Sequence, residues 1–156
     1  MNLSDGFVIH ASVVSKELDE LIYELTIPHL VIGNPNFTSH LCWIDIDNRL
    51  AGELAAKHLL EMGYQSLAYV GGKMEDQISM HRLEGVLSVL NRHDVIIPKG
   101  YVKQGESECD EAYSMMESIL SMRKKPDAVI CANNYIAYGC VTALQQHGIQ
   151  IPQEIG

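Results

Sequence analysis

Short apolar runs alternate with helical patterns along the whole chain, and this alternation constrains the fold more than any other feature. We predict buried strands at residues 7–9, 29–32, 41–46, 66–70 and 128–131, with a shorter one at 101–102. We predict helices at residues 15–25, 49–62, about 81–93, 110–122 and 134–147. Strands that alternate with helices form βαβ units, whose mostly parallel sheets are covered by helices on both faces. The sequence therefore predicts an α/β fold.

The clearest of these helices spans residues 49–62. Its apolar residues follow the helical period, so we expect them to face the core: Leu50, Ala51, Leu54, Ala55, Leu59 and Met62. Asp47-Asn48 is predicted to cap its start, and Gly63 suits the left-handed position after its end. Asn133-Asn134 is predicted to cap the last helix in the same way.

Composition excludes several classes of protein. The 156 residues carry 11 basic and 20 acidic side chains, a net charge of -9, which disfavours binding to a phosphate backbone. The four cysteines lack the spacing of a zinc site, so we expect reduced thiols and no bound metal or cofactor. The first residues do not resemble a signal peptide, and no apolar run approaches the roughly 20 residues of a membrane span. We therefore expect a cytoplasmic protein.

The usual signatures of catalysis are missing. The sequence contains no G-x-G-x-x-G, G-x-x-x-x-G-K-[ST], H-E-x-x-H or G-x-S-x-G pattern. Asp45 and Asp47 alternate at a strand end and would point to opposite faces, which does not suit a pair of catalytic carboxylates. Gly71-Gly72-Lys73 after a strand is a weak signal for phosphate binding, because glycine is common where a strand enters a loop. We therefore do not expect an enzyme.

Polar side chains gather in the loops after the predicted strands, where folds of this class bind ligands. These residues are Asn34, Asp76, Arg82, Glu106, Ser107 and Asn133. Arginine offers a fixed fork of donors, and asparagine offers both a donor and an acceptor, which suits a ligand rich in hydroxyl groups. The alternative for Arg82 is an ordinary surface charge on a helix.

Several motifs, in this order and spacing, resemble one family. They are Ile44-Asp45-Ile46-Asp47-Asn48, Ala51-Gly52, His58-Leu59-Leu60, Gly63-Tyr64, Leu67-Ala68-Tyr69-Val70-Gly71-Gly72, Arg82-Leu83-Glu84-Gly85, Pro126-Asp127-Ala128-Val129-Ile130-Cys131-Ala132-Asn133-Asn134, Ala137-Tyr138-Gly139, Gly148-Ile149 and Ile151-Pro152-Gln153-Glu154-Ile155. Together they are similar to the effector-binding domain of the lactose-repressor (LacI/GalR) family of bacterial transcription regulators. The likeness covers nearly the whole chain.

The resemblance implies the periplasmic-binding-protein-like type I fold, a sandwich of parallel sheets and helices in two lobes that close on a small ligand. By analogy, residues 1–40 are the remainder of the N-terminal lobe, residues 41–45 cross between the lobes, and residues 46–156 form the C-terminal lobe. The resemblance implies truncation at both ends: the helix-turn-helix domain and the first strands would precede this chain, and a final strand would follow Gly156.

The family's ligand residues carry over position by position. Arg82 matches the arginine that binds sugar hydroxyls, and Asn133 matches an asparagine at the mouth of the cleft. Ser107 stands where several members have a stacking aromatic ring, so that contact is in doubt. Asn134 replaces the usual aspartate, and we expect it to keep a capping hydrogen bond without the charge. The predicted ligand-binding residues are therefore Asn34, Asp76, Arg82, Ser107 and Asn133.

Two further features come from the resemblance. Gly33-Asn34-Pro35 and Trp43 resemble the corresponding residues of maltose-type regulators. An alternative for Trp43 is that its side chain only packs against other apolar side chains. The helix over residues 135–147 lies near the dimer interface in this family, which makes Tyr138 and Val141 candidate interface residues of a homodimer.

The resemblance implies a sugar-binding and dimerisation domain, in which an effector changes operator affinity through the absent helix-turn-helix domain. One alternative is a transport protein of the same fold, which predicts a signal peptide and a monomer. Another is a small enzyme acting on a nucleotide, which requires a catalytic constellation that the sequence lacks.

Overall fold

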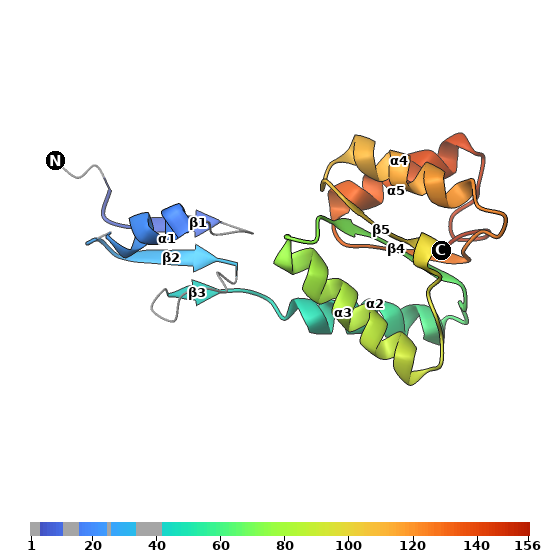
Figure 1. Cartoon of the computed structure of the whole chain (residues 1–156), viewed down its shortest axis with the longest axis horizontal. Helices are drawn as coiled ribbons and strands as arrows, with labels where there is room; N and C mark the ends of the chain where they lie inside the picture. The colour runs from blue at the N-terminus through green and yellow to red at the C-terminus, as the bar shows by residue number, and fades with distance from the viewer. Residues whose placement is uncertain (1–3, 11–15, 25, 34–41) are drawn as a thin grey trace. The chain divides into compact units, whose positions relative to one another are not determined.

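Three parallel strands organise residues 48–156 in the computed structural model (Figure 1). β4 (Leu67–Gly72) lies in the centre of the sheet, with β5 (Val102–Gly105) on one side and β6 (Ala128–Cys131) on the other. Gly72 pairs with Gly105, and Val70 pairs with Cys131, so the carboxyl ends of all three strands meet at one edge. The predicted α/β fold with a parallel sheet is confirmed.

Helices cover both faces of this sheet (Figure 1). α2 (Asn48–Glu61) and α3 (Gln77–Arg92) pack together on one face, and α4 (Cys109–Leu120) and α5 (Asn134–Gln146) pack together on the other. A 3-10 turn at Lys99–Tyr101 leads into β5. The two layers of helices produce the predicted sandwich in this part of the chain.

The structure describes residues 4–10, 16–24, 26–33 and 42–156, which fall into two compact units, residues 1–47 and 48–156. The first unit contains β1 (Phe7–His10), α1 (Lys16–Tyr23), β2 (His29–Ile32) and β3 (Trp43–Ile44), with a parallel sheet in the order β1-β2-β3. Ile22 and Val31 are its fully buried side chains among the described residues. The division into lobes at residues 41–45 stays a prediction.

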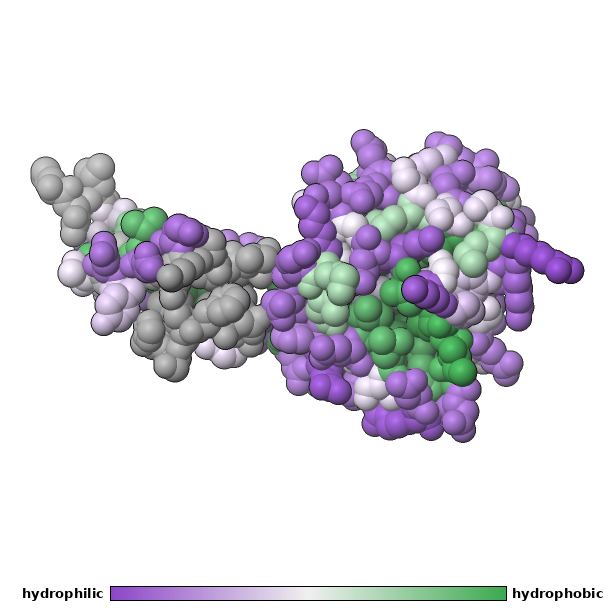
Figure 2. Space-filling model, viewed as in Figure 1, coloured by the Kyte–Doolittle hydropathy of each residue, from purple (hydrophilic) through white to green (hydrophobic). Residues whose placement is uncertain are grey.

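The core of the second unit forms on both faces of β4, whose six residues are all buried. Its largest fully buried side chains are Tyr69, Leu67, Leu90, Met116, Ile119, Ile136, Val70, Val86 and Cys140. Burial at this scale is the main stabilising term, at about 25 cal/mol for each Å² of apolar surface removed from water. Figure 2 shows that hydrophobic side chains also gather on one visible face, between α3 and the segment that leads to β5.

The predicted inner face of α2 is wrong in part: Ala55 and Leu59 pack against the core as expected, but three other members of the predicted face are exposed. Leu50, Leu54 and Met62 are 48%, 59% and 64% exposed, whereas Gly52 and Ala56 are buried. The helix therefore buries its smallest side chains most completely, and the large side chains of Leu50 and Leu54 remain in contact with solvent. The helical period of hydrophobic residues does not by itself distinguish these two faces, because alanine and glycine contribute little hydrophobicity to it.

The bounds of several elements also differ from prediction. α3 begins at Gln77 rather than near residue 81, because the Asp76 carboxylate caps it by accepting a hydrogen bond from the Ile78 amide at 3.1 Å. Tyr101 belongs to the 3-10 turn, so β5 starts one residue later and is longer than expected. Among the described residues of the run predicted at 41–46, which begin at residue 42, β3 covers Trp43–Ile44. Ser15 and Leu25, the predicted ends of the first helix, lie outside the described residues.

Close backbone contacts hold α2 against α3. A Cβ atom at Gly52 would overlap the carbonyl oxygen of Arg82, and one at Gly85 would overlap the carbonyl oxygen of Arg49. The two helices therefore meet backbone to backbone at both places, which only glycine permits. This contact sets the position of Arg82 relative to α2.

Asp127 joins the amino ends of β4 and β6. Its carboxylate accepts hydrogen bonds from the Gln65 and Ser66 amides, both at 2.9 Å, and its own amide donates to the Ser66 carbonyl oxygen at 2.8 Å. These bonds connect positions more than sixty residues apart in the sequence. They fix the register at the edge of the sheet opposite the carboxyl ends.

Other global features follow from the described residues. All four cysteines are free thiols. No helix in the described part of the chain is both long enough and apolar enough to cross a membrane.

We expect Gly52→Ala to destabilise the protein by about 1–3 kcal/mol or more, because the added methyl group would force α2 away from the Arg82 backbone. This effect would outweigh the helix propensity gained from alanine, about 1 kcal/mol. Urea unfolding followed by circular dichroism measures the change. Glu84→Ala, at an exposed position of α3, is the control and should stay within about 0.5 kcal/mol of the original chain. Equal stabilities of the two variants would contradict the close approach of the helices.

Candidate functional site

Three loops gather at the carboxyl edge of the second sheet. Residues 73–76 follow β4, residues 106–108 follow β5, and residues 132–133 follow β6. These loops contain Asp76, Ser107 and Asn133, and Arg82 lies on α3, which starts from the first of them. Four of the five predicted ligand-binding residues therefore belong to one edge. Asn34, the fifth, lies outside the described residues.

The Arg82 side chain is hydrogen-bonded to two segments of the chain outside its own helix. Its Nε donates a hydrogen bond to Asn48 Oδ1 at 3.0 Å, and its Nη1 donates to the carbonyl oxygen of Ala132. Asn48 opens α2, and Ala132 lies between β6 and the cap of α5. The half-buried guanidinium is therefore fixed beside Asn133, and the alternative of an ordinary surface charge is wrong.

Asp76 and Ser107 converge on Gly72, the last residue of β4. A Cβ atom at Gly72 would lie 2.7 Å from Asp76 Oδ2 and 2.8 Å from Ser107 Oγ. The two oxygen atoms come from different loops, after β4 and after β5. The missing side chain of Gly72 therefore leaves room for two polar groups at the centre of the edge.

Asn133 caps α5, and this corrects the expectation for its neighbour. Asn133 Oδ1 accepts a hydrogen bond from the Ile136 amide at 2.9 Å. Asn134, predicted to make the capping bond, is instead the first residue of the helix and is exposed. The cap occupies the carboxamide oxygen of Asn133 and orients its amide group, which is the donor that a ligand could use.

A buried network supports the end of β4. The Gly72 amide donates to Ser79 Oγ at 2.7 Å, and the Tyr69 hydroxyl donates to the Ser79 carbonyl oxygen at 2.8 Å. Burial raises the pKa of Tyr69 to about 12, against an opposing effect of its hydrogen bond to Ser79. These bonds join the first turn of α3, and with it Asp76 and Arg82, to the central strand.

The same contacts disfavour phosphate binding at Gly71-Gly72-Lys73. The Gly72 amide, which a phosphate would need, already donates to Ser79. Lys73 forms an ion pair with Glu106, and this carboxylate raises the pKa of the exposed Lys73 ammonium group. Glu111 Oε2 in turn accepts a hydrogen bond from the Glu106 amide at 2.8 Å. Carboxylates therefore surround the cation at this position.

Sequence reasoning missed Asn48 and Ser79 as parts of this site. Asn48 was predicted only as a cap, yet it contacts Arg82, 34 positions away. Ser79 carries no motif, and its 1% exposure is the property that marks it. The remaining predicted residues, Tyr138 and Val141, lie on α5, where their side chains are 69% and 37% exposed.

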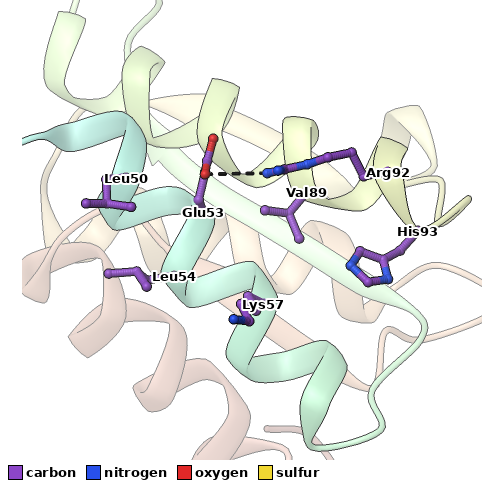
Figure 3. A pocket seen from close by; sticks show the side chains of 7 residues that line it. All are labelled: Leu50, Glu53, Leu54, Lys57, Val89, Arg92 and His93. Carbon is purple, nitrogen blue, oxygen red and sulfur yellow. Dashed lines mark ion pairs between the residues drawn. The ribbon is translucent and has the colours of Figure 1, made fainter.

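A separate hollow of about 390 Å³ lies between the outer sides of α2 and α3 (Figure 3). Its polar lining includes Arg92, whose Nη2 pairs with Glu53 at 3.4 Å, and Lys57, which pairs with Glu61 at 3.7 Å. None of the predicted ligand-binding residues lines it. Among the described residues, no group of three histidine, cysteine or acidic side chains could hold a metal ion.

Known proteins with similar sequences support the family. The sequence profile of the periplasmic binding protein-like domain family matches residues 56–156. The HTH-type transcriptional repressor PurR of Vibrio atlanticus (strain LGP32) is 29% identical over 152 residues, which are 97% of this chain and 46% of that protein. The chain thus spans about half the length of the curated relatives that it matches.

Solved structures agree on the fold. A putative transcriptional regulator LacI from Bacillus cereus subsp. cytotoxis is 21% identical with a TM-score of 0.85, over 97% of this chain and 54% of that one. The transcriptional regulator CelR in complex with cellobiose is 22% identical with a TM-score of 0.87, over 99% of this chain and 48% of that one. The predicted resemblance to a LacI/GalR effector-binding domain is confirmed, and the maltose-type subgroup stays a prediction.

The raised pKa of Tyr69 predicts a loss of stability in alkali. The folded chain keeps the Tyr69 hydroxyl proton up to about pH 12, whereas the unfolded chain releases it near pH 10. The stabilisation that the protonated hydroxyl gives to the folded state is therefore complete below pH 10 and is lost as the pH rises from 10 to about 12. The loss amounts to about 2–3 kcal/mol, at about 1.4 kcal/mol for each unit of pKa difference. Urea unfolding from pH 8 to 11.5 measures it. Tyr69→Phe should have a lower free energy of unfolding than the original chain at pH 8, and that free energy should decrease less steeply as the pH rises. Parallel decreases in the two chains would contradict the assignment of the stability loss to Tyr69.

Proposed function

We propose that this chain, which belongs to the periplasmic binding protein-like domain family, is the effector-binding domain of a bacterial LacI/GalR-type transcription regulator. In this proposal a small molecule binds at the carboxyl edge of the second sheet and shifts the chain between two conformations that differ in operator affinity. In the same proposal, the chain crosses from the first lobe to the second at residues 41–45.

The fixed guanidinium of Arg82 is the observation that supports this function best. Two hydrogen bonds, to Asn48 and to Ala132, orient the fork beside the capping Asn133. A donor fork held in place before the ligand arrives loses little conformational entropy on binding. It provides the directional donors that sugar hydroxyls require.

Charge at the same edge supports an uncharged effector. In residues 73–82 and 106–111, the cations are Lys73 and Arg82, and the acidic side chains are Glu75, Asp76, Glu106, Glu108, Asp110 and Glu111. A phosphorylated ligand would meet this excess of carboxylates, whereas hydroxyl groups can donate to them. A neutral sugar therefore suits the site better than a sugar phosphate or a nucleotide, and maltose and cellobiose are suitable probes.

Operator binding is proposed for a separate helix-turn-helix part of the whole regulator. The PurR relatives are HTH-type repressors, a class named after this motif, and the chain spans about half of their length. The net charge of -9 disfavours direct contact of these 156 residues with DNA. A cytoplasmic location belongs to the same proposal.

A thermal-shift series tests the effector site. A neutral sugar at about 100 times its Kd should stabilise the chain by about 2.7 kcal/mol, which raises the Tm by several degrees. Arg82→Ala should abolish the shift while the chain stays folded. Arg92→Ala, which removes an exposed arginine of the same helix, is the matched control and should keep the shift.

Two results would overturn this proposal. One is a shift with nucleotides and with none of the sugars. The other is a sugar shift of the same size in Arg82→Ala and in the original chain.

We propose a homodimer whose interface includes α5. Tyr138 is 69% exposed on this helix, and large apolar side chains in an interface are usually exposed in the isolated subunit. Tyr138→Asp should convert the dimer into a monomer, because the interface would have to bury the new charge. Sedimentation equilibrium measures the mass, and Leu54→Asp, at an exposed apolar position of α2, should leave it unchanged. A monomeric original chain, or a dimeric Tyr138→Asp, would refute this interface.

A further inference from the structure

We propose that Asn48 is a positioning residue of the effector site: its carboxamide oxygen holds the Arg82 guanidinium in the orientation that binds the effector. The inference rests on the proposed function, since it deals with the same arginine. It goes further by assigning a role to a residue on another helix, one that need not touch the effector itself.

Burial shows that Asn48 is more than the start of a helix. Its side chain is 4% exposed, and it is one of two buried polar residues among those that the structure describes. Buried polar groups persist where a partner satisfies them, and Asn48 Oδ1 accepts from Arg82 Nε at 3.0 Å. The bond is charge-assisted, which makes it stronger and more directional than a bond between neutral groups.

The bond fixes the one arginine nitrogen that determines the plane of the guanidinium. With Nε tied to α2 and Nη1 tied to the Ala132 carbonyl oxygen, rotation of the group would break one bond or both. Within residues 4–10, 16–24, 26–33 and 42–156, no side chain or carbonyl accepts from Arg82 Nη2. The donors that remain for a ligand therefore point in a direction set by Asn48 and Ala132.

Helix packing places Asn48 within reach. Asn48 lies one helical turn before Gly52, and Gly52 contacts the Arg82 backbone directly. The reciprocal contact between Gly85 and the Arg49 backbone prevents the helices from sliding. The position of the acceptor is thus set by the rigid pair α2 and α3, rather than by a loop.

Affinity measurements by isothermal titration with maltose and cellobiose test this role. Asn48→Ala should weaken binding by about 10-fold, the loss typical of one hydrogen bond to a charged group. Asn48→Asp keeps the acceptor oxygen and should stay within about 3-fold of the original affinity. In an Arg82→Lys background, which lacks Nε–H, Asn48→Ala should produce no further loss.

A second measurement does not require a ligand. The Arg82 Nε–Hε signal in a proton–nitrogen correlation spectrum reports its hydrogen bond, and it should shift or broaden in Asn48→Ala and persist in Asn48→Asp. The Arg92 Nε–Hε signal, whose partner is the Ser88 carbonyl oxygen, is the internal control and should not move. Urea unfolding of each variant shows whether a change in affinity merely follows a change in stability.

The outcomes separate the two proposals. If neither sugar binds the original chain, the sugar-binding function fails, and the Arg82 signal then decides the positioning role by itself. An Arg82 signal that Asn48→Ala leaves unchanged would overturn the inference. So would equal losses of affinity from Asn48→Ala in the original and Arg82→Lys backgrounds.

Discussion

The backbone of α2 lies so close to that of α3 that a methyl group does not fit at Gly52 or at Gly85. Much of the second unit depends on this contact. It brings Asn48 within hydrogen-bonding distance of Arg82 and determines which side of α2 can face inward. It also joins the two helices into one layer over the sheet, so that the residues at their amino ends keep fixed positions beside the carboxyl edge.

The order of strands and helices was predictable because buried strands and capped helices leave local signals. The inner face of α2 was predictable only in part: Ala55 and Leu59 pack against the core as expected, but two leucines of the predicted face do not. Leu50 and Leu54 dominate the hydrophobic period, but the close approach at Gly52 needs small residues inside and turns the leucines outward. The start of α3 was missed because Asp76 was interpreted as a loop residue, whereas its carboxylate caps the helix by accepting a hydrogen bond from the Ile78 amide.

The candidate site was predictable only in part. The positions of Asp76, Ser107 and Asn133 could be predicted because they lie in loops that follow strands, and a parallel sheet brings such loops to one edge. Arg82 lies on α3, the helix that starts from the first of these loops. Asn48 and Ser79 could not be found, since their roles depend on burial and on partners distant in sequence or on backbone amides. The sequence also does not separate the capping residue from its neighbour, because both Asn133 and Asn134 are of a residue type that caps helices, and the hydrogen bond to the Ile136 amide assigns the cap to Asn133.

The strand order β5-β4-β6 has a consequence for synthesis of the chain on the ribosome. β4 is made first and then lies in the centre, so both of its neighbours must be added from residues that emerge later. α2, β4 and α3 therefore leave the ribosome with one face of the sheet still uncovered and both strand edges open, a state in which a nascent chain is prone to aggregation. The Asp127 bonds to Gln65 and Ser66 can form only when β6 arrives, so they close the sheet at the end of this period.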